Sequence, residues 1–321
     1  MRVLVTGASG RIGLLVTRDL LEHGHSVRGL DKSPPRVELR DEMRVETEKH
    51  PEWRGRLETT YDDLTDRLAL LRAAQGCDAI VHLAAIPSPS HANEDVLTHN
   101  NVVGTQFVFA AAEAHDIRRV ALASSCCVFG IVFARHHFDP QYLPLDDDHP
   151  RLPQDLYGLS KLMNEENAAA YWRRCGIAST CLRITAVMRL TGEPAPWHRR
   201  QLEWSHRHRS RDLWTYVDER DMARAFRLTI EKEDLEGSHN LILAARDSYS
   251  PFDIRALLNE HFPSLDEYSK SLAPRQSAYN TQRAEEIIGW VAQHSWRDTD
   301  DGKSVLEELR ARDDLDMPLA D

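Results

Sequence analysis

Apolar residues along the first three quarters of the chain recur with two alternating periods, and this pattern predicts alternating strands and helices. Short β-branched and aliphatic runs predict strands at Arg2–Thr6, Ser26–Asp31, Ala79–Ala84, Val120–Ser124, Ser179–Ile184 and His239–Leu243. Apolar residues at helical spacing predict helices over Gln106–Ala114 and Met163–Tyr171, and one that carries Ile12, Leu15, Val16 and Leu20 on a single face. Such alternation is typical of a parallel sheet covered by helices on both faces. The predicted fold class is therefore α/β, with a doubly wound parallel sheet.

Four segments do not follow this alternation. Residues 32–57 are polar and charged, and they predict a surface excursion with a short helix. Residues 131–156 contain several prolines and three consecutive aspartates, which predict a long loop. Residues 189–212 are rich in arginine, and the acidic tail after Asp298 predicts a solvated helix with a fraying end. Long loops in compact domains often serve as lids or binding loops.

Composition and charge narrow the class of protein. The 321 residues are 41% hydrophobic and 28% charged, which allows one large core or a core with a smaller lobe. A formal net charge of −11 argues against nucleic acid and against an anionic membrane surface as partners. Five cysteines without Cys-x-x-Cys spacing argue against a disulfide framework or a zinc site. With no membrane-length apolar stretch and a strand directly after Met1, we expect a soluble, reduced, cytoplasmic protein without a signal peptide.

The first predicted strand runs into the sequence TGASGRIG at residues 6–13, and an amphipathic helix follows at once. Gly7 permits a tight turn, Gly10 lets the backbone approach a pyrophosphate, and Gly13 lets the helix pack on the strand. The helix N-terminus supplies free N–H groups and a partial positive charge to the phosphates. Strand, glycine turn and helix together predict a Rossmann-type dinucleotide-binding fold.

Asp31 ends the second predicted strand, at the distance from the glycine turn that such folds require. A carboxylate there accepts hydrogen bonds from the adenosine ribose and repels a 2′-phosphate, which favours NAD over NADP. Lys32 and Arg36 could soften this preference. The alternative interpretation of Asp31 is a turn-forming aspartate ahead of the Lys-Ser-Pro-Pro run.

Tyr157 and Lys161 lie four residues apart in the sequence YGLSK, so they share one face of the helix that follows. An ammonium beside the phenol lowers a phenol pKa of about 10, and the phenolate can take a proton from a substrate hydroxyl while hydride leaves to the cofactor. The Tyr-x-x-x-Lys pattern is common by chance. It supports a catalytic role here because a serine follows a central strand upstream of it. Ser125 follows a central strand at the edge where α/β sheets bind ligands, and it could polarise the substrate oxygen. We interpret Ser124 as strand-end turn chemistry.

With these residues in place, the chain resembles the extended class of the short-chain dehydrogenase/reductase family, the NAD-dependent epimerase/dehydratases. The matching pieces, in family order, are TGASGRIG at 6–13, Asp31, Asp63-Leu64, HLAA at 82–85, NVVGT at 101–105, SSCCVFG at 124–130, YGLSK at 157–161 and Leu182-Arg183. They cover residues 1 to about 185. A weaker match continues at WTYVD, residues 214–218, and the C-terminal seventy residues match little.

The resemblance implies roles for these residues. Ser125, Tyr157 and Lys161 would form the catalytic triad, with Asn101 as a supporting residue near the proton relay. Asp63 and Leu64 would contact the adenine. The full set of implied cofactor-binding residues is Gly7, Gly10, Arg11, Ile12, Gly13, Asp31, Asp63, Leu64, Leu83, Ala84, Ala85, Tyr157 and Lys161. The resemblance also implies NAD as the cofactor, chemistry without a metal, and a homodimer.

Domain limits follow from the motifs and the resemblance together. We expect a dinucleotide-binding Rossmann domain over residues 1–184, to which residues 213–245 return. Residues 185–321 are expected to form mainly a smaller C-terminal substrate lobe. Asp218 and Asp221 fall near a family-like position, but they also suit an ordinary helix N-terminus and are left out of the site.

Two departures from the family pattern bear on the substrate. Dehydratases of the family carry Asp-Glu directly after the catalytic hydroxyl residue, whereas this chain has Cys126 and Cys127, which argues against sugar dehydration. After Leu182-Arg183, many nucleotide-sugar enzymes continue with Asn-Val-Tyr-Gly-Pro, whereas this chain reads ITAVM. This second departure weakens a nucleotide-sugar assignment.

Three functions remain open at this point. The leading one is an NAD-dependent oxidoreductase of carbohydrate metabolism that transfers a hydride at a secondary alcohol or ketone carbon of a sugar or sugar derivative. The second is a nucleotide-sugar epimerase with tightly bound NAD. The third is a redox-sensing binding protein on the same fold, since a fold does not fix a function. The presence of Ser125, Tyr157 and Lys161 argues against the third.

The arginine-rich segment has two interpretations that the sequence does not separate. Guanidinium groups there could hold an anionic substrate group by paired hydrogen bonds, or they could be solvated surface charges. The arginines concerned are Arg189, Arg199, Arg200, Arg207, Arg209 and Arg211. The neighbouring His198, His206 and His208 have no carboxylate or cysteine to complete a metal site, so we expect surface residues.

Overall fold

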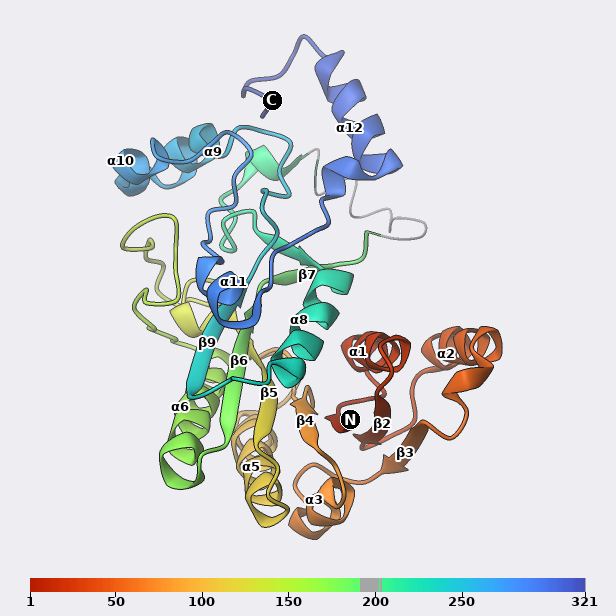
Figure 1. The fold of residues 1–321 in the computed structure, drawn as a ribbon. Coiled ribbons are helices and arrows are strands. Elements are labelled where there is room, and N and C mark those ends of the chain that lie inside the picture. The colour runs from red at the N-terminus through yellow and green to blue at the C-terminus, as the bar shows by residue number, and fades with distance from the viewer. Residues whose placement is uncertain (191–201, 203, 321) are drawn as a thin grey trace. The chain divides into compact units, whose positions relative to one another are not determined.

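The computed structural model describes residues 1–190, 202 and 204–320 (Figure 1). The chain forms two compact units, and each is assembled from separate stretches of the sequence. The first unit contains residues 1–128, 155–183 and 223–240. The second contains residues 129–154, 184–222 and the described chain from residue 241 onwards.

Seven strands form one parallel sheet in the order β3-β2-β1-β4-β5-β6-β9. Their bounds are β1 Arg2–Thr6, β2 Ser26–Asp31, β3 Leu57–Tyr61, β4 Ala79–His82, β5 Arg119–Ser125, β6 Ala178–Ile184 and β9 Ser238–Leu243. The chain enters in the middle at β1, adds β2 and β3 on one side, and then crosses to β4 on the other side of β1. In register, Leu4 of β1 lies between Arg28 of β2 and Ile80 of β4. This topology confirms the predicted doubly wound α/β fold.

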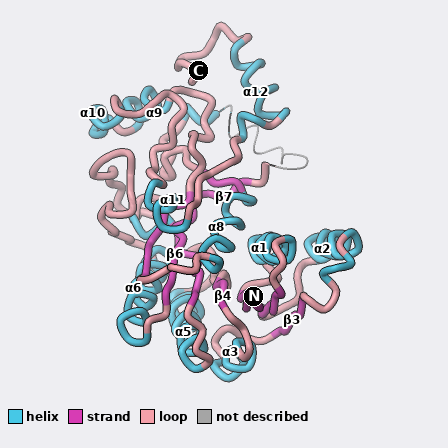
Figure 2. The backbone as a smooth tube through the Cα atoms, viewed as in Figure 1, coloured by secondary structure: helices cyan, strands magenta, loops and turns pink. Residues whose placement is uncertain are grey.

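Helices cover both faces of this sheet (Figures 1 and 2). They are α1 Arg11–Glu22, α2 Val37–Lys49, α3 Arg67–Ala74, α4 Glu94–Thr98, α5 Gly104–Ala114, α6 Leu156–Cys175 and α8 Glu219–Glu231. Helices α3, α5 and α6 pack on one face through a buried cluster that includes Leu4, Leu70, Phe109 and Ala168. On the other face, α1 and α8 are joined by a 2.8 Å hydrogen bond from Arg227 Nε to Asp19.

Short helical turns complete the first unit. They are the 3₁₀ turns η1 Pro51–Trp53 and η3 Cys126–Phe129, and a π-helical turn, η2 His99–Val103. The π turn lies between α4 and α5, and such turns inside helices are frequent at functional sites. The pattern of apolar positions does not predict this turn.

The edge strand β3 was also missed by the sequence analysis, which placed a surface excursion over residues 32–57. Half of that excursion is the helix α2, which agrees with the short helix expected there and has no buried residue. Strand β3 has the sequence LETTY, and only Leu57 is partly buried. The strand therefore lacks the alternation of apolar and polar residues by which a strand is predicted. It is held by backbone pairing with β2, in which Thr59 lies opposite Gly29.

The second unit contains a small parallel pair of strands, β7 Ala186–Met188 and β8 Tyr216–Asp218. Its helices are α9 Ile254–His261, α10 Asp266–Ser269, α11 Gln282–Ile288 and α12 Asp300–Arg310, with 3₁₀ turns η4 Ser205–Arg207, η5 Pro263–Leu265 and η6 Trp296–Asp298. Buried hydrogen bonds connect β8 to the loop after β9 and to η6. The Tyr216 hydroxyl donates to Asp247 (2.8 Å) and accepts the N–H of Trp296 (3.0 Å). The Ser295 hydroxyl donates to the other oxygen of Asp247 (2.6 Å).

The prediction of a merely solvated helix after Asp298 is wrong. Helix α12 buries Val305, Leu306 and Leu309 along one face. Thr299 is its N-cap, and the Thr299 hydroxyl accepts the N–H of Gly302 at 3.0 Å. The acidic residues in its first turn had suggested a solvated segment. They instead interact favourably with the positive end of the helix dipole, and the helix packs within the second unit.

The division of the chain differs from the expected domain limits at residues 129–154 and at both ends of the stretch 213–245. The chain passes into the second unit after Arg183, but residues 129–154, which we had placed in the first domain, belong to the second unit. They are tied there because Leu145 pairs with Tyr279 and Arg283 hydrogen-bonds to Asp148 (2.5 Å). Of the stretch 213–245, residues 223–240 belong to the first unit.

Candidate active site

The glycine turn between β1 and α1 is shaped for close packing of backbone on backbone. Gly7 has a φ of 75°, and a Cβ on it would lie 2.7 Å from the backbone nitrogen of Ala84. A Cβ on Gly13 would lie 2.0 Å from the carbonyl oxygen of Gly7, so this position admits no side chain. Gly10, the N-cap of α1, has extended backbone and brings no capping side chain, so the helix N-terminus is left to an external anion.

A pocket of about 620 Å³ opens along this turn in the first unit. It is lined by Gly7, Gly10, Arg11, Ile12, Gly13, Leu30, Asp31, Lys32, Asp62, Asp63, Leu64, Leu83, Ala84, Ala85, Ile86, Pro87, Asn100 and Ala123. Every cofactor-binding residue implied by the resemblance is in this lining except Tyr157 and Lys161. The structure therefore brings the glycine turn, the acidic end of β2 and the strand ends of β4 and β5 together around one cavity.

Asp31 lies at the end of β2, and its carboxylate accepts the backbone N–H of Ser9 at 3.0 Å and that of Ser33 at 3.4 Å. The bond to Ser9 ties the carboxylate to the glycine turn. The alternative interpretation, a local turn-forming aspartate, accounts for the bond to Ser33 but not for the bond across to Ser9. This geometry fits a carboxylate held ready for ribose hydroxyls.

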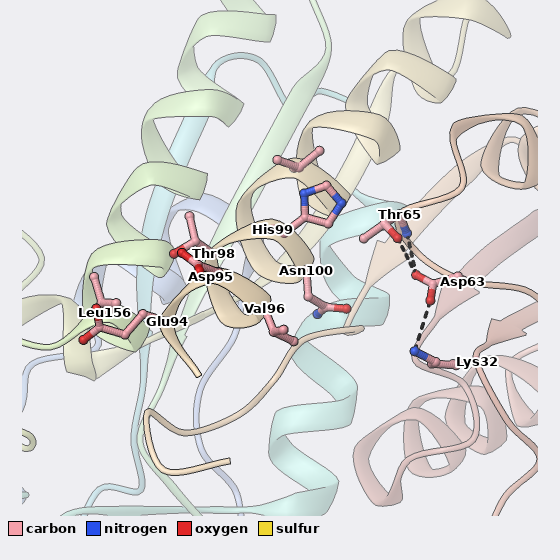
Figure 3. A pocket seen from close by; sticks show the side chains of 11 residues that line it. Lys32, Asp63, Thr65, Glu94, Asp95, Val96, Thr98, His99, Asn100 and Leu156 are labelled. Carbon is pink, nitrogen blue, oxygen red and sulfur yellow. Dashed lines mark hydrogen bonds and ion pairs between the residues drawn. The ribbon is translucent and has the colours of Figure 1, made fainter. Parts of the chain in front are cut away.

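Asp63 joins the pocket to a second cavity of about 730 Å³ (Figure 3). One carboxylate oxygen accepts the N–H (2.9 Å) and the hydroxyl (2.7 Å) of Thr65, and the other lies 3.1 Å from Nζ of Lys32. The hydrogen bonds from Thr65 and then the Lys32 ammonium hold the pKa of Asp63 down at about 2. In Figure 3 these residues face His99 and Asn100 of the π turn across the cavity.

The catalytic residues proposed from the sequence lie together at the start of α6 and the end of β5. Asp155 is the N-cap of α6, and its carboxylate accepts the N–H of Gly158 at 2.8 Å. This places Tyr157 in the first turn and Lys161 one turn later on the same buried face. Tyr157 is hydrogen-bonded to the Ser125 side chain, and the Ser125 hydroxyl also accepts the N–H of Cys127 at 3.2 Å.

Burial dominates the protonation chemistry of this pair. It raises the pKa of Tyr157 above the usual range, the Cys127 thiol adds to this shift, and the hydrogen bond from Ser125 opposes it. Burial also lowers the pKa of Lys161 to about 8. The Lys161 ammonium donates to the carbonyl oxygen of Ala123 at 2.8 Å, which fixes it at the strand end. A buried phenol of raised pKa needs such a nearby positive charge to ionise.

Asn101, expected as a supporting residue near the proton relay, has both its backbone carbonyl and its side-chain amide engaged in hydrogen bonds. Its backbone carbonyl already accepts two hydrogen bonds, from Thr105 Oγ1 (2.6 Å) and from Asn164 Nδ2 (3.0 Å). Its side-chain amide pairs with the backbone of Ile86 in both directions and donates to Ser160 Oγ at 3.3 Å. Through these contacts Asn101 joins the π turn to Ile86 of the pocket lining and to α6.

Cys126 and Cys127 take the places that dehydratases give to an acid and a base. Both are buried, and the Cys126 thiol donates to the carbonyl oxygen of Arg183 at 3.3 Å. None of the five cysteines forms a disulfide. Removal of water from a sugar uses a carboxyl group as acid and base, and neither cysteine supplies one.

The arginines of residues 189–212 that the structure describes have partners within the second unit. Arg209 pairs with Asp139, and its guanidinium stacks 4.2 Å from the ring centroid of Phe262. Arg189 lies 3.0 Å from Glu219. Arg211 bonds to His137 (2.8 Å) and Arg207 stacks 4.4 Å from the ring centroid of Trp204. Arg199, Arg200 and His198 lie outside the described residues.

The expected surface position of His206 is wrong. This side chain is only 8% exposed and packs 4.3 Å from the ring of Phe252. No group of histidine, cysteine, aspartate or glutamate side chains within the described residues could hold a metal ion. Within the same residues, no helix is long and apolar enough to cross a membrane.

Residues 3–243 match the family model described as the NAD dependent epimerase/dehydratase family. The chain belongs to this family. Uronate dehydrogenase from Pseudomonas syringae pv. tomato is 31% identical over 63% of this chain and 63% of its own length, so the match spans less than two thirds of that relative. UDP-glucose 4-epimerase from Corynebacterium glutamicum is 23% identical over 97% of this chain and 95% of its own length.

Solved structures of the epimerase/dehydratase family share the fold. UDP-glucose 4-epimerase from Bifidobacterium longum, in complex with NAD+ and UDP, superimposes with a TM-score of 0.69 at 18% identity, over 97% of this chain and 99% of that one. NAD, the expected cofactor, is the cofactor of this family. The narrow glycine turn, the open N-terminus of α1 and the tethered Asp31 fit its pyrophosphate and ribose.

Proposed function

We propose that this enzyme is an NAD-dependent dehydrogenase that transfers a hydride at a secondary alcohol or ketone carbon of a sugar or sugar acid. The observation that carries the proposal is the cluster of Ser125, Tyr157 and Lys161 at the strand end of β5, in the same unit as the glycine turn. A cofactor-binding protein without catalysis would have no use for a buried phenol beside a buried ammonium.

The proposed residues divide the work as follows. Gly7, Gly10 and Gly13 with the N-terminus of α1 would hold the pyrophosphate, and Asp31 would hold the adenosine ribose. Bound NAD would supply the hydride acceptor. With substrate bound, the Ser125 hydroxyl would donate its hydrogen bond to the reacting oxygen instead of to Tyr157, and so orient the hydroxyl that is oxidised.

Tyr157 takes the proton from that hydroxyl as the carbon is oxidised. Its phenolate is disfavoured by burial, so the nearby Lys161 ammonium must stabilise the charge. The Ala123 carbonyl holds this ammonium in place. In the reverse direction the Tyr157 hydroxyl returns the proton to the carbonyl oxygen.

Two observations favour a dehydrogenase over other reactions of the family. The buried thiols of Cys126 and Cys127 stand where dehydratases carry their acid and base. The uronate dehydrogenase match supports a sugar acid as substrate. The second candidate is a nucleotide-sugar epimerase, which the longer match to UDP-glucose 4-epimerase supports. A cytoplasmic location and a homodimer stay predictions.

A substrate panel separates the two candidates. Purified enzyme is mixed with NAD and single sugars, uronic acids or UDP-sugars, and NADH is read by absorbance. Net NADH with a sugar or sugar acid supports the dehydrogenase. NAD retained through purification, with interconversion of UDP-sugars and no net NADH, supports the epimerase. In either case Tyr157→Phe serves as the control for chemistry at this site, and full activity of that variant would overturn both assignments.

A further inference from the structure

His82 occupies a buried position that the proposed mechanism does not use. It ends β4, is only 2% exposed, and bridges two elements of the first unit. Its Nδ1 lies 2.6 Å from Oγ1 of Thr6, the residue before Gly7 in the glycine turn. Its Nε2 lies 2.9 Å from Oγ1 of Thr105 on α5.

The neighbouring groups determine which ring nitrogen carries the proton. Thr105 Oγ1 donates to the carbonyl oxygen of Asn101 at 2.6 Å, and a carbonyl can only accept. The single hydroxyl proton of Thr105 is therefore used, and His82 must donate to Thr105 from Nε2. In a neutral ring Nδ1 is then an acceptor, which receives the hydroxyl proton of Thr6. Burial, together with the nearby Lys161 charge, lowers the pKa of His82 to about 3, which keeps the ring neutral.

In this series of hydrogen bonds, each group consequently donates to the next one and never the reverse. The N–H of Ala84 points to Thr6 Oγ1 at 3.4 Å, Thr6 donates to His82, His82 to Thr105, and Thr105 to the Asn101 carbonyl. Each hydroxyl accepts one hydrogen bond and donates one, and because the Asn101 carbonyl can only accept, the whole series has a single direction. Buried chains that are satisfied in this way are rigid and specify one arrangement.

The chain reaches the catalytic helix through Asn101. The Asn101 amide donates to Ser160 Oγ (3.3 Å), and the Ser160 hydroxyl donates to the carbonyl oxygen of Tyr157 (2.8 Å). At its other end, Ala84 and Gly7 both line the cofactor pocket. One series of hydrogen bonds thus links the phosphate end of the pocket to the backbone of Asn101, and a second series links the Asn101 side chain to the backbone of the first turn of α6.

We propose that His82 is a positioning residue that couples occupation of the glycine turn to the placement of Tyr157. The proposal rests on the proposed function of Tyr157. A phosphate bound at the turn of Thr6 and Gly7 would restrict the motion of the Thr6 hydroxyl. The hydrogen bonds through His82 and Thr105 would then restrict the motion of Asn101 and of the start of α6. The competing explanation is that the chain only satisfies buried polar groups and contributes stability alone.

Hydrogen exchange at the start of α6 tests the coupling without any turnover. The probe is ADP, which carries two phosphates but neither nicotinamide nor its ribose. Binding of ADP should slow exchange of the backbone amides of residues 156–161 in the wild-type protein. In Thr105→Val, which keeps His82 and Thr6 but breaks the link to Asn101, ADP should still bind and this protection should fall by about fivefold or more.

The experiment also needs a matched control variant and a direct measurement of which His82 ring nitrogen carries the proton. Thr180→Val removes another fully buried hydroxyl of the first unit, which contacts Thr229 at 2.8 Å and lies outside the chain. It should leave the ADP-dependent protection unchanged. Nitrogen NMR should show His82 as the neutral Nε2–H tautomer with and without ADP.

The outcomes decide between coupling and stability. If Thr105→Val and Thr180→Val lose stability alike and both keep the ADP-dependent protection, the coupling is overturned. A His82 ring protonated on Nδ1 would overturn it as well. Failure of the proposed function is distinguishable, because it would appear as turnover that survives Tyr157→Phe, a result on which the exchange measurement does not depend.

Discussion

The Lys161 ammonium lies 5.6 Å from the ring centroid of Tyr157 and is pinned by a 2.8 Å hydrogen bond to the Ala123 carbonyl. One helical turn separates the two residues, and the same strand end, β5, carries both the carbonyl and Ser125. The charge that must stabilise the phenolate is therefore fixed by the sheet rather than left to a flexible side chain. Such fixed charge needs no rearrangement when the proton moves.

Tyr157→Phe should abolish most turnover without unfolding the protein. The change removes only the hydroxyl, so the helix and the glycine turn remain. We expect the turnover rate to fall by about 10²–10⁴-fold, while NAD affinity by calorimetry changes little. Turnover near the wild-type rate would show that another group accepts the proton.

Lys161→Met should change how stability depends on pH. Burial lowers the folded-state pKa of Lys161 from 10.5 to about 8, so between these values the unfolded chain holds a proton that the folded protein lacks. The wild-type protein should therefore gain unfolding free energy relative to the Met variant as pH rises through this window. Urea unfolding across the window measures the difference, and a pH-independent difference contradicts the assignment. NAD affinity should also be weaker in the variant.

Gly10→Ala and Gly13→Ala should separate cofactor binding from folding. A Cβ on Gly10 would approach the Gly7 carbonyl oxygen only to 3.4 Å, so the variant should fold, but the methyl group fills space needed by phosphate. We expect its NAD dissociation constant to rise by at least about tenfold. A Cβ on Gly13 would meet that oxygen at 2.0 Å, so the second variant should lose about 1–3 kcal/mol of stability or more. Thermal melts with calorimetry check both, and equal stability of the two variants would contradict the packing argument.

Asp31→Asn should narrow the preference for NAD over NADP. The variant keeps the shape of the side chain and removes the charge that repels a 2′-phosphate. The ratio of kcat/KM values for the two cofactors gives the result. A wild-type enzyme that uses NADP as well as NAD would refute the role given to Asp31.

Arg209→Ala should affect stability more than substrate affinity. Its guanidinium is already engaged by Asp139 and by the ring of Phe262. We expect a loss of about 1 kcal/mol of stability and a change in substrate KM of less than about tenfold. Arg207→Ala, which removes a guanidinium stacked on the half-exposed Trp204, is the matched control. A large rise in KM for Arg209→Ala alone would restore the idea of an anion clamp.

Sequence patterns were informative where apolar spacing or glycine chemistry governs the backbone. The central strands and the glycine turn follow directly from buried aliphatic residues and from Gly7 and Gly13. Strand β3 could not be predicted in this way, because its residues are mostly exposed and its order comes from pairing with β2. The packing of α12 was hidden for a similar reason, since its acidic first turn masks the apolar face of Val305 and Leu309.

The site shows the same limit. Ser125, Tyr157 and Lys161 were accessible from spacing, because one helix face and one strand end define them. Nothing in the spacing shows that the Asn101 carbonyl is already occupied by Thr105 and Asn164, since those bonds join separate helices. His82 was noticed only as part of a motif, and its protonation state depends on hydroxyl groups far away in the sequence.

The order in which the chain supplies its strands has a consequence for synthesis in the cell. Strand β9, residues 238–243, occupies the end of the sheet beside β6, and it is the last strand of that sheet to leave the ribosome. Until it arrives, β6 is an open edge made almost entirely of residues that are buried in the finished protein. Exposed apolar edges invite pairing between chains. We therefore expect the nascent protein to pass through a stage at which this edge can pair with other chains, and a chain truncated before residue 238 to be prone to aggregation.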